Sequence, residues 1–274
     1  MKTDTQKKVL ITGASSGIGH EVAQFLTERG WEVWGTSRDT SRLQPRPHFH
    51  AVKMDLTCDE SIRNAFSCAS RDAGGFNVLI NNAGSGVFCL SFSVTSELAR
   101  EQFQVLVHGP IELIRLAVPH MLQHHNGIII NISSLAGTFP IPYMGAYNAA
   151  KAALSSYSHC LRLELAQTAI RIVDVKPADI NTNFHASTNR VIVMPSDADS
   201  TFLAAVWDAQ QRNMATAPPP SRVAEIIVRI INNPNPPASI TVGNFLQSKA
   251  GPWISRIVPE RLQDFFLSRL YGLP

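Results

Sequence analysis

Residues Lys8–Gly19 read KVLITGASSGIG, and this stretch decides the fold. The run Val9–Thr12 is typical of a buried strand. Glycines follow at positions 13, 17 and 19, where they allow a tight turn and a close approach of the backbone to a ligand. A helical pattern then covers Ile18–Arg29, and the start of a helix presents free N–H groups and a positive dipole end. A strand, a glycine loop and a helix in this order predict a binding site for a pyrophosphate.

Apolar, β-rich runs recur along the chain with helical patterns between them. Most of these runs are continuous, which indicates strands buried on both faces. Because parallel neighbours need a crossover, strands that alternate with helices predict a parallel sheet. The expected strands are Val9–Thr12, Glu32–Gly35, His50–Met54, Val78–Asn81, Gly127–Ile132, Arg171–Lys176 and Ile240–Val242. We find no linker between two cores, so the sequence predicts one α/β domain with a doubly wound, seven-stranded sheet.

The composition excludes several classes of protein. The 274 residues are 45% hydrophobic and 16% charged, which is enough apolar material for a core and rules out disorder. A net charge of +3, without a basic cluster, gives no indication of nucleic-acid binding. The four cysteines show neither metal-ligand spacing nor dense pairing, so we expect thiols and no metal site. The first residues lack the apolar core of a signal peptide, and we expect a cytoplasmic protein.

The second half of the chain departs from the strand–helix rhythm. A long helix over Ser96–Leu122 contains Gly109–Pro110, where proline predicts a kink. After Thr182 the pattern becomes irregular, with one helix around Ser196–Gln211, and a long excursion of this kind is typical of a lid. We therefore divide the domain into a cofactor and catalytic platform (1–182), a substrate lid (183–220), and a last helix, strand and helical tail (221–274).

Five motifs in order give the chain a family resemblance. They are TGASSGIG at Thr12–Gly19, a D-x-T segment at Asp55–Thr57, NNAG at Asn81–Gly84, NISSLAG at Asn131–Gly137 and a Y-x-x-x-K pair at Tyr147 and Lys151. Together they resemble the short-chain dehydrogenase/reductase family, from Val9 to about Thr182. The resemblance implies a Rossmann-type sheet and an oxidoreductase that uses a nicotinamide cofactor. The tail resembles, more loosely, the 17β-hydroxysteroid and retinol dehydrogenases and the acyl-dihydroxyacetone-phosphate reductases.

The resemblance also implies which residues bind the cofactor. They are Gly13, Ser15, Ser16, Gly17, Ile18 and Gly19 in the loop, Asp55 and Leu56 at the adenine, Asn82, Ala83 and Gly84 beside the sheet, Tyr147 and Lys151 at the ribose, and Pro177, Ile180 and Thr182 near the nicotinamide. At the end of the second strand, a carboxylate binds the ribose of NAD, whereas an arginine accommodates the 2′-phosphate of NADP. Arg38 occupies this position and Asp39 follows it, so we expect NADP(H).

Tyr147, Lys151 and Ser134 are the expected catalytic residues. A spacing of four places the tyrosine and the lysine on one face of a helix. A nearby ammonium group lowers the pKa of a phenol, which otherwise titrates near 10. By resemblance, Tyr147 protonates the substrate oxygen and Ser134 hydrogen-bonds it. Ser134 is preferred to Ser133 because it directly precedes LAG.

One departure from the family pattern keeps a second hypothesis open. The family often has an asparagine in V-N-x-x-G for a proton relay, whereas this chain reads VLVHG, with Leu106 at that position. His108 could contribute only if the kink turned it inward. The alternative to an enzyme is therefore an NADP(H)-binding sensor or scaffold with weak or lost catalysis.

The lid and neighbouring loops predict a lipophilic substrate. The expected contacts are Ser134, Phe139, Tyr143, Phe184 and Phe202, which would suit a small carbonyl or alcohol such as a steroid, retinoid or fatty-acyl compound. Arg190 or His185 could bind an anionic group of the substrate, but a solvated charge is the favoured expectation for both. For the amphipathic tail, a helix pair that covers the pocket is favoured over a membrane-surface or dimer contact. The resemblance implies a homodimer or homotetramer formed through the Ser96–Leu122 and Tyr147 helices.

Overall fold

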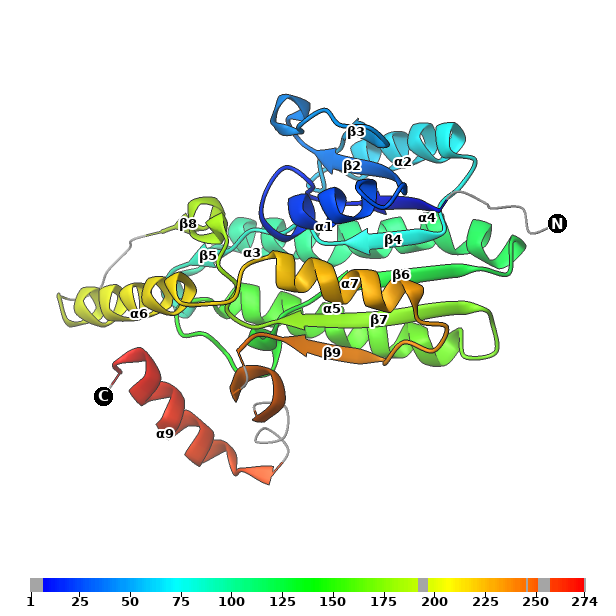
Figure 1. The fold of residues 1–274 in the computed structure, drawn as a ribbon. Helices are drawn as coiled ribbons and strands as arrows, with labels where there is room; N and C mark the ends of the chain where they lie inside the picture. Colours follow the sequence, from blue (N-terminus) through cyan, green and yellow to red (C-terminus); the bar gives the residue numbers. More distant parts are fainter. Residues whose placement is uncertain (1–6, 192–196, 245, 251–256, 274) are drawn as a thin grey trace.

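A single sheet of seven parallel strands organises the computed structural model, which describes residues 7–191, 197–244, 246–250 and 257–273 (Figure 1). The strand order is β3-β2-β1-β4-β6-β7-β9. The strands are β1 (Lys8–Ile11), β2 (Glu32–Ser37), β3 (Phe49–Lys53), β4 (Val78–Asn81), β6 (Gly127–Ile132), β7 (Ile170–Pro177) and β9 (Ser239–Val242). All seven expected strands are present, with ends within two residues of those expected. The doubly wound Rossmann-type fold is confirmed.

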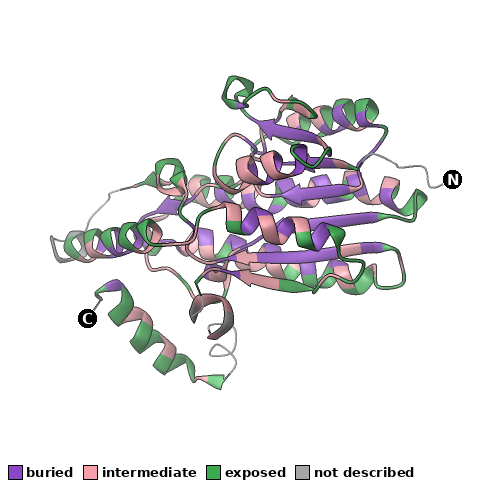
Figure 2. Ribbon diagram, viewed as in Figure 1, coloured by how far each residue is buried: buried purple, intermediate pink, exposed green. Residues whose placement is uncertain are grey.

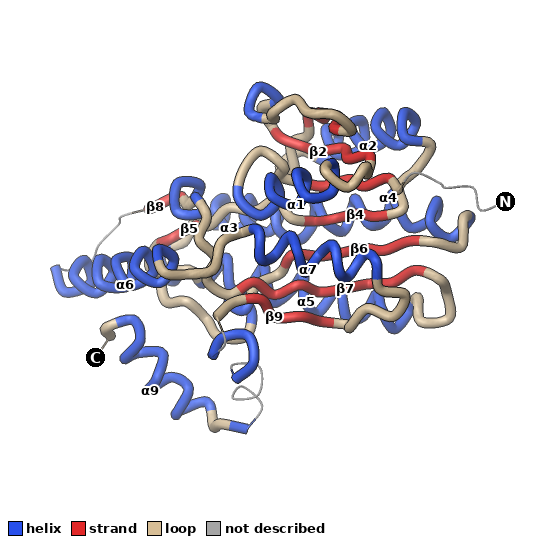
Figure 3. Tube along the Cα trace, viewed as in Figure 1, coloured by secondary structure: helices blue, strands red, loops and turns tan. Residues whose placement is uncertain are grey.

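Helices cover both faces of the sheet (Figure 3). The helices α1 (Gly17–Thr27) and α7 (Ser221–Asn232) pack on one face. The other face is covered by α2 (Asp59–Ala73), α4 (Gly109–Gln123) and α5 (Gly145–Glu164). The C-cap of α1 is Glu28, and Gly30, three residues beyond the end of the helix, has a φ of +74°. This left-handed conformation is the one that favours glycine after a helix.

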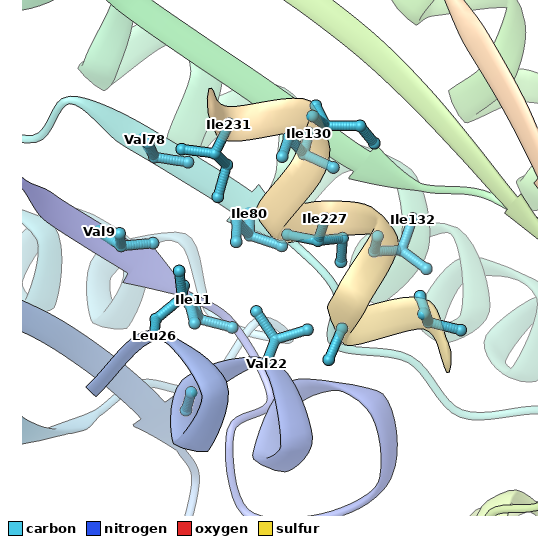
Figure 4. Close-up of a cluster of buried hydrophobic side chains, with 14 of the residues drawn as sticks. Val9, Ile11, Val22, Leu26, Val78, Ile80, Ile130, Ile132, Ile227 and Ile231 are labelled. Atoms are coloured by element: carbon cyan, nitrogen blue, oxygen red, sulfur yellow. The ribbon is translucent and has the colours of Figure 1, made fainter. Parts of the chain in front are cut away.

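The side chains of β1 show how one strand serves both layers. Val9 and Ile11 point to the α1 and α7 face, whereas Leu10 belongs to the cluster on the other face. This alternation follows from the two-residue repeat of a strand. All three side chains have no solvent exposure, and Figure 4 shows Val9 and Ile11 beside Val22, Leu26 and Ile227 of the covering helices. The central strands are accordingly buried along their length (Figure 2).

The long helix is interrupted where proline was expected to kink it. The segment α3 (Ser96–Phe103) is followed by a π-helical turn, η3 (Gln104–His108), before α4 begins at Gly109. The N–H of Gly109 donates to the carbonyl of Gln104, five residues back. Pro110 has no N–H for the carbonyl of Leu106, and a wider turn accommodates that loss. The whole stretch Ser96–Gln123 is long and apolar enough to cross a membrane by length and composition alone, but its window is 44% buried inside the protein.

Lid and tail lie together at one end of the sheet (Figure 1). The lid helix α6 (Asp197–Ala215) extends four residues beyond the expected end at Gln211, and it contacts the tail helix α9 (Glu260–Tyr271). A second sheet, which the sequence analysis did not predict, pairs β5 (Val87–Phe88) with β8 (Asn189–Arg190). It joins the loop after β4 to the beginning of the lid. The remaining short helices are η1 (Thr40–Arg42), η2 (Ser91–Ser93), η4 (Leu135–Gly137), η5 (Asn183–Ser187) and η6 (Leu246–Ala250).

Candidate active site

The glycine loop between β1 and α1 is shaped as a cradle. Gly13 and Gly17 have φ values of +70° and +55°, a conformation that other residues rarely adopt. Gly19 is required for a different reason, because a Cβ atom there would lie 2.2 Å from the carbonyl oxygen of Gly13. The N-terminus of α1 opens at this point, with Ser16 as its N-cap. The loop therefore fits a pyrophosphate, which the backbone can approach without side chains in the way.

The NNAG segment after β4 fixes this loop in place. The Nδ2 atom of Asn82 donates to the carbonyl oxygens of Thr12 (2.9 Å) and Gly13 (3.2 Å). In return, the Thr12 hydroxyl accepts the N–H groups of Asn82 (2.9 Å) and Ala83 (3.0 Å). These four bonds join the ends of two neighbouring strands. Asn82 therefore holds the loop as well as lying beside the expected cofactor.

A row of buried amides supports the sheet directly behind. Asn81 Nδ2 donates to Asn131 Oδ1 at 2.8 Å, and Asn131 Nδ2 donates to the Ser158 hydroxyl at 2.8 Å. All three side chains are buried. The row links β4, β6 and α5, so the helix that carries Tyr147 and Lys151 is held in register with the strand that leads to Ser134.

At the other end of the expected cofactor site, Arg38 is exposed directly after β2. The Asp39 carboxylate accepts the N–H (3.0 Å) and the hydroxyl (2.7 Å) of Ser41, and these bonds lower the pKa of Asp39. Asp39 therefore caps η1. Further along, Asp55 forms a similar turn, accepting the N–H of Thr57 at 2.9 Å, beside the buried Leu56.

Tyr147 and Lys151 lie one turn apart on α5, and both are buried. The Lys151 Nζ atom donates to the carbonyl of Ile132 at 2.7 Å and lies 5.8 Å from the centre of the Tyr147 ring. The Ser134 hydroxyl hydrogen-bonds Tyr147. It also accepts the N–H of Ala136 at 3.0 Å. The structure thus brings the three expected catalytic side chains together.

Burial shifts the pKa values of both Tyr147 and Lys151. Burial raises the pKa of Tyr147 to about 12, and only its hydrogen bond with Ser134 opposes the change. Burial also lowers the pKa of Lys151 to about 8, which Asp174 partly offsets. The pKa of Tyr147 is therefore raised overall, because desolvation of the buried phenol outweighs the effect of Ser134. At neutral pH the tyrosine therefore holds its proton.

The reactive side chains face an apolar cluster. Tyr147 packs with Phe88, Leu106 and Met144, and the Phe184 ring lies 5.5 Å from the Tyr147 ring. Leu106 is 1% exposed. It lies beside Gly84, where an added Cβ atom would be 3.0 Å from the Leu106 Cδ2 atom. The departure from the family pattern is thus at the site itself. His108, by contrast, is exposed, so it does not replace the missing asparagine.

The expected substrate contacts fall into two groups. Phe184 and Tyr143 pack against the apolar cluster, and Tyr143 adopts a φ of +64° that is rare for an aromatic residue. Phe139 and Phe202 are partly exposed. On the lid helix the cluster buries Leu203, Val206 and Trp207, whereas Phe202 is not part of it.

The residues expected at the nicotinamide end lie at the end of β7 and in the segment that follows it toward the lid. Pro177 ends β7, and its carbonyl lies 3.4 Å from the Ser134 hydroxyl. Ile180 is buried in the core. Thr182 approaches the glycine loop, since its Cγ2 atom would be 3.5 Å from a Cβ at Gly17. The nicotinamide end of the expected cofactor site therefore lies close to the glycine loop.

His185 is not a solvated charge, as the sequence suggested. Its two ring nitrogens are buried, its ring packs edge-on against Trp207 at 4.6 Å, and burial lowers its pKa. Arg190 is exposed, and its guanidinium carbon lies 4.4 Å from the centre of the Trp207 ring. Met144 was not expected as a site residue. The helical apolar pattern identifies Trp207 as buried, but only the fold brings it next to Phe88.

Comparison with known proteins identifies the family. A family model described as short chain dehydrogenase matches residues 7–191. The chain belongs to the short-chain dehydrogenase family. It is therefore an oxidoreductase by family.

Relatives in this family include lipid and steroid enzymes. The chain is 33% identical over 275 residues to 3-ketodihydrosphingosine reductase of Bacteroides thetaiotaomicron, covering 97% of this chain and 98% of that protein. It is 30% identical to an NADPH-dependent 1-acyldihydroxyacetone phosphate reductase of Schizosaccharomyces pombe, over 67% and 63% of the two chains. A short-chain dehydrogenase structure from Streptomyces avermitilis, 26% identical, matches with a TM-score of 0.80 over 97% of this chain and 96% of its own.

Proposed function

We propose that this short-chain dehydrogenase is a cytoplasmic NADP(H)-dependent reductase that converts a ketone on a long-chain lipid to an alcohol. The observation that carries the proposal is the Ser134–Tyr147 hydrogen bond at the edge of an apolar cluster. A polar pair that can hold a carbonyl oxygen, next to side chains that can hold an alkyl chain, suits a lipophilic ketone.

Each catalytic residue has a separate task. The Ser134 hydroxyl donates a hydrogen bond to the carbonyl oxygen and orients it toward Tyr147. Tyr147 transfers its phenolic proton to that oxygen as negative charge develops there. Lys151 stabilises the resulting phenolate, since its ammonium group is one turn away on the same helix. A nicotinamide held in this site would supply the hydride for the carbonyl carbon, or accept it when an alcohol is oxidised.

The cofactor is held by the cradle and by the end of β2. The glycine loop takes the pyrophosphate, Asp55 and Leu56 meet the adenine, and Thr182 meets the carboxamide. Arg38 favours NADP(H), because its exposed guanidinium group can pair with a 2′-phosphate. The Ser41 contacts support this choice, since they occupy the Asp39 carboxylate that would otherwise bind a ribose hydroxyl.

The substrate class follows from the lining and from the relatives. A full-length relative at 33% identity is named for reducing 3-ketodihydrosphingosine, and another is named for reducing an acyl-dihydroxyacetone phosphate. Both names describe a ketone on a long-chain lipid. 3-Ketodihydrosphingosine is therefore the first compound to test on this chain.

A reductase assay tests the proposal directly. Purified protein is mixed with NADPH and with 3-ketodihydrosphingosine, an acyl-dihydroxyacetone phosphate, a steroid ketone or a short aliphatic ketone, and loss of NADPH absorbance is followed. We expect turnover with a long-chain ketone and little with the short one. Turnover of short ketones alone would overturn the lipid assignment, and NADH preferred over NADPH would overturn the cofactor assignment.

Leu106 supports a second candidate, a sensor or scaffold that binds NADP(H) without chemistry. Leucine cannot hydrogen-bond a water of a proton relay, and Leu106 lies beside the site. Tight NADPH binding without turnover across the whole panel would favour this candidate. Against it stands the complete set of Ser134, Tyr147 and Lys151.

We also propose a homodimer or homotetramer formed through α4 and α5. Both helices carry an exposed leucine near their C-terminal ends, Leu122 with 39% and Leu163 with 67% exposure. Sedimentation velocity on the wild type and on Leu163→Glu tests this interface, since a charge there should favour the monomer. An unchanged sedimentation coefficient would place the interface elsewhere.

A further inference from the structure

A carboxyl group lies buried behind the site, outside the set of residues that the proposed mechanism uses. Asp174 is in the middle of β7 and is 3% exposed. Charged side chains are almost never buried unless they are paired, because desolvation is costly. The surroundings of Asp174 therefore need an explanation.

Its two oxygens bind groups from both sides of the site. The Ser133 hydroxyl, next to Ser134 in the chain, donates to Oδ1. The Ser155 hydroxyl, one turn beyond Lys151 on α5, donates to Oδ2 at 2.6 Å. Asp174 thus connects the segment that carries the catalytic serine with the helix that carries the catalytic lysine.

The groups around Lys151 also indicate a role for Asp174. Among the described residues, α5 contributes Tyr147, β6 contributes the Ile132 carbonyl, and η3 contributes the apolar Leu106. Acidic charge comes from β7, where Asp174 acts on Lys151 and is itself paired with Lys176 at 3.5 Å. Lys176 is a competing cation, and its side chain is 23% exposed.

We propose that Asp174 is a positioning residue that keeps Lys151 protonated and fixes the spacing between Ser134 and α5. The inference rests on the proposed role of Lys151 in reduction. Without the carboxylate, a buried ammonium group would lose its proton at a lower pH. Loss of that proton removes the charge that stabilises the tyrosine phenolate.

The pH profile of ketone reduction is the first test. Asp174→Asn keeps the size of the side chain and can still bond both serines, but it removes the charge. We expect the alkaline limb of kcat to move to lower pH by about half to one unit, with KM for NADPH unchanged. Lys176→Met should move the limb the other way, because it removes a competing cation. An alkaline limb that is the same in Asp174→Asn and wild type would overturn the proposal.

Ser155→Ala separates charge from structure. This variant removes one hydrogen bond to Asp174 and keeps the carboxyl group. If Asp174 were only structural, Asp174→Asn and Ser155→Ala would both lower Tm and leave the pH limb in place, which would contradict the proposal. We expect Ser155→Ala to keep the wild-type limb.

Urea unfolding of the cofactor-free protein gives a readout that does not depend on activity. Stability rises with pH between the pKa of Lys151 in the folded state and its pKa in the unfolded chain. A lower folded-state pKa moves the start of this rise to lower pH. The rise that is attributable to Lys151, measured against Lys151→Met, should therefore begin at lower pH when Asp174→Asn is present. If the wild type reduces no ketone, the proposed function fails while this experiment still decides the inference.

Discussion

The Lys151 ammonium group donates a 2.7 Å hydrogen bond to the carbonyl of Ile132, the last residue of β6. This bond ties the helix of Tyr147 to the strand that leads into Ser134. The three side chains proposed as catalytic are therefore positioned by main-chain geometry that the sheet itself fixes. Rigid elements of this kind are suited to holding reacting groups within a few tenths of an ångström.

Tyr147→Phe should leave the fold intact and remove catalysis. The ring is buried among apolar side chains, so losing one hydroxyl costs little packing. Removing a general acid lowers rates by about 10² to 10⁴-fold. We expect kcat for ketone reduction to fall by this amount, with NADPH binding, measured by fluorescence titration, within about threefold of wild type. A rate near that of wild type would assign the proton to another group.

Arg38→Ala should weaken NADPH binding selectively. A charge-assisted bond to a phosphate contributes roughly 1.5–3 kcal/mol, which corresponds to about 10- to 100-fold in Kd. NADH lacks the phosphate, so its affinity should not change. Asp39→Ala is the matched control, because that carboxylate is bonded to Ser41 and should not affect NADPH. Equal weakening of both cofactors would show that Arg38 does not read the 2′-phosphate.

Lys151 should make stability rise with pH. Its pKa falls from 10.5 to about 8 on folding, so the unfolded chain binds the extra proton between these values. Stability therefore increases as pH rises through this window, by roughly 3.5 kcal/mol at most, since one pKa unit is about 1.4 kcal/mol. Urea unfolding at pH 7.5 and 9.5 should show the rise in wild type and a smaller one in Lys151→Met. Identical slopes would mean that the lysine is not desolvated.

Gly19→Ala should damage the loop, whereas Gly30→Ala should not. A Cβ at position 19 would meet main-chain atoms of Gly13 at 2.2 Å and the Asn82 amide at 2.4 Å, and the backbone cannot yield cheaply. We expect loss of NADPH binding and a lower Tm. At Gly30 a Cβ meets nothing within 4 Å, so only the left-handed strain of about 1–2 kcal/mol applies. Equal NADPH affinity in the two variants would contradict the proposal that the glycine loop binds the pyrophosphate.

The two sides of α9 should respond differently to mutation. Tyr271 is 8% exposed and belongs to the cluster that contains Trp207, so Tyr271→Ala should lower Tm and raise KM for a lipid ketone. Phe265 and Phe266, with 51% and 63% exposure, lie on the outer side. Changing both to serine should leave Tm within about a degree.

The outer side also predicts contact with lipid. Arg269 stacks 5.1 Å from the Phe265 ring, so a basic group accompanies the exposed aromatic side chains. Such a surface adsorbs to anionic vesicles. We expect wild type to pellet with them more than the double serine variant, and a chain that ends at Ala250 to pellet least. The same partitioning for all three would exclude an adsorbing role for the tail.

The sequence predicted the sheet because its signals are local. Seven apolar runs separated by helical patterns leave few alternatives to a parallel sheet, and the glycines of the first loop identify its ligand end. The π-helical turn was expected only as a kink. The cause of this turn is local, because proline has no N–H to donate. Whether the helix bends or forms a wider turn depends on what packs around Leu106.

What the sequence missed depends on contacts between distant segments. The pairing of Val87 with Asn189 joins residues a hundred positions apart, and each strand is only two residues long, too short for a periodic signal. Asp174 reads as an interruption in an apolar strand, and only the fold shows Ser133 and Ser155 beside it. His185 is buried because Trp207 of the lid helix packs against it. No residue near His185 in the sequence predicts that contact.

Trp207 has a consequence for how the protein can be studied. Its indole lies on the lid between Phe88 (4.9 Å), His185 and Arg190 (4.4 Å), so small movements of α6 change its surroundings. Indole emission responds to polarity and to nearby cations. Lid opening and closure can therefore be followed in real time by intrinsic fluorescence, without attaching a dye, once Trp31, Trp34 and Trp253 are replaced by phenylalanine.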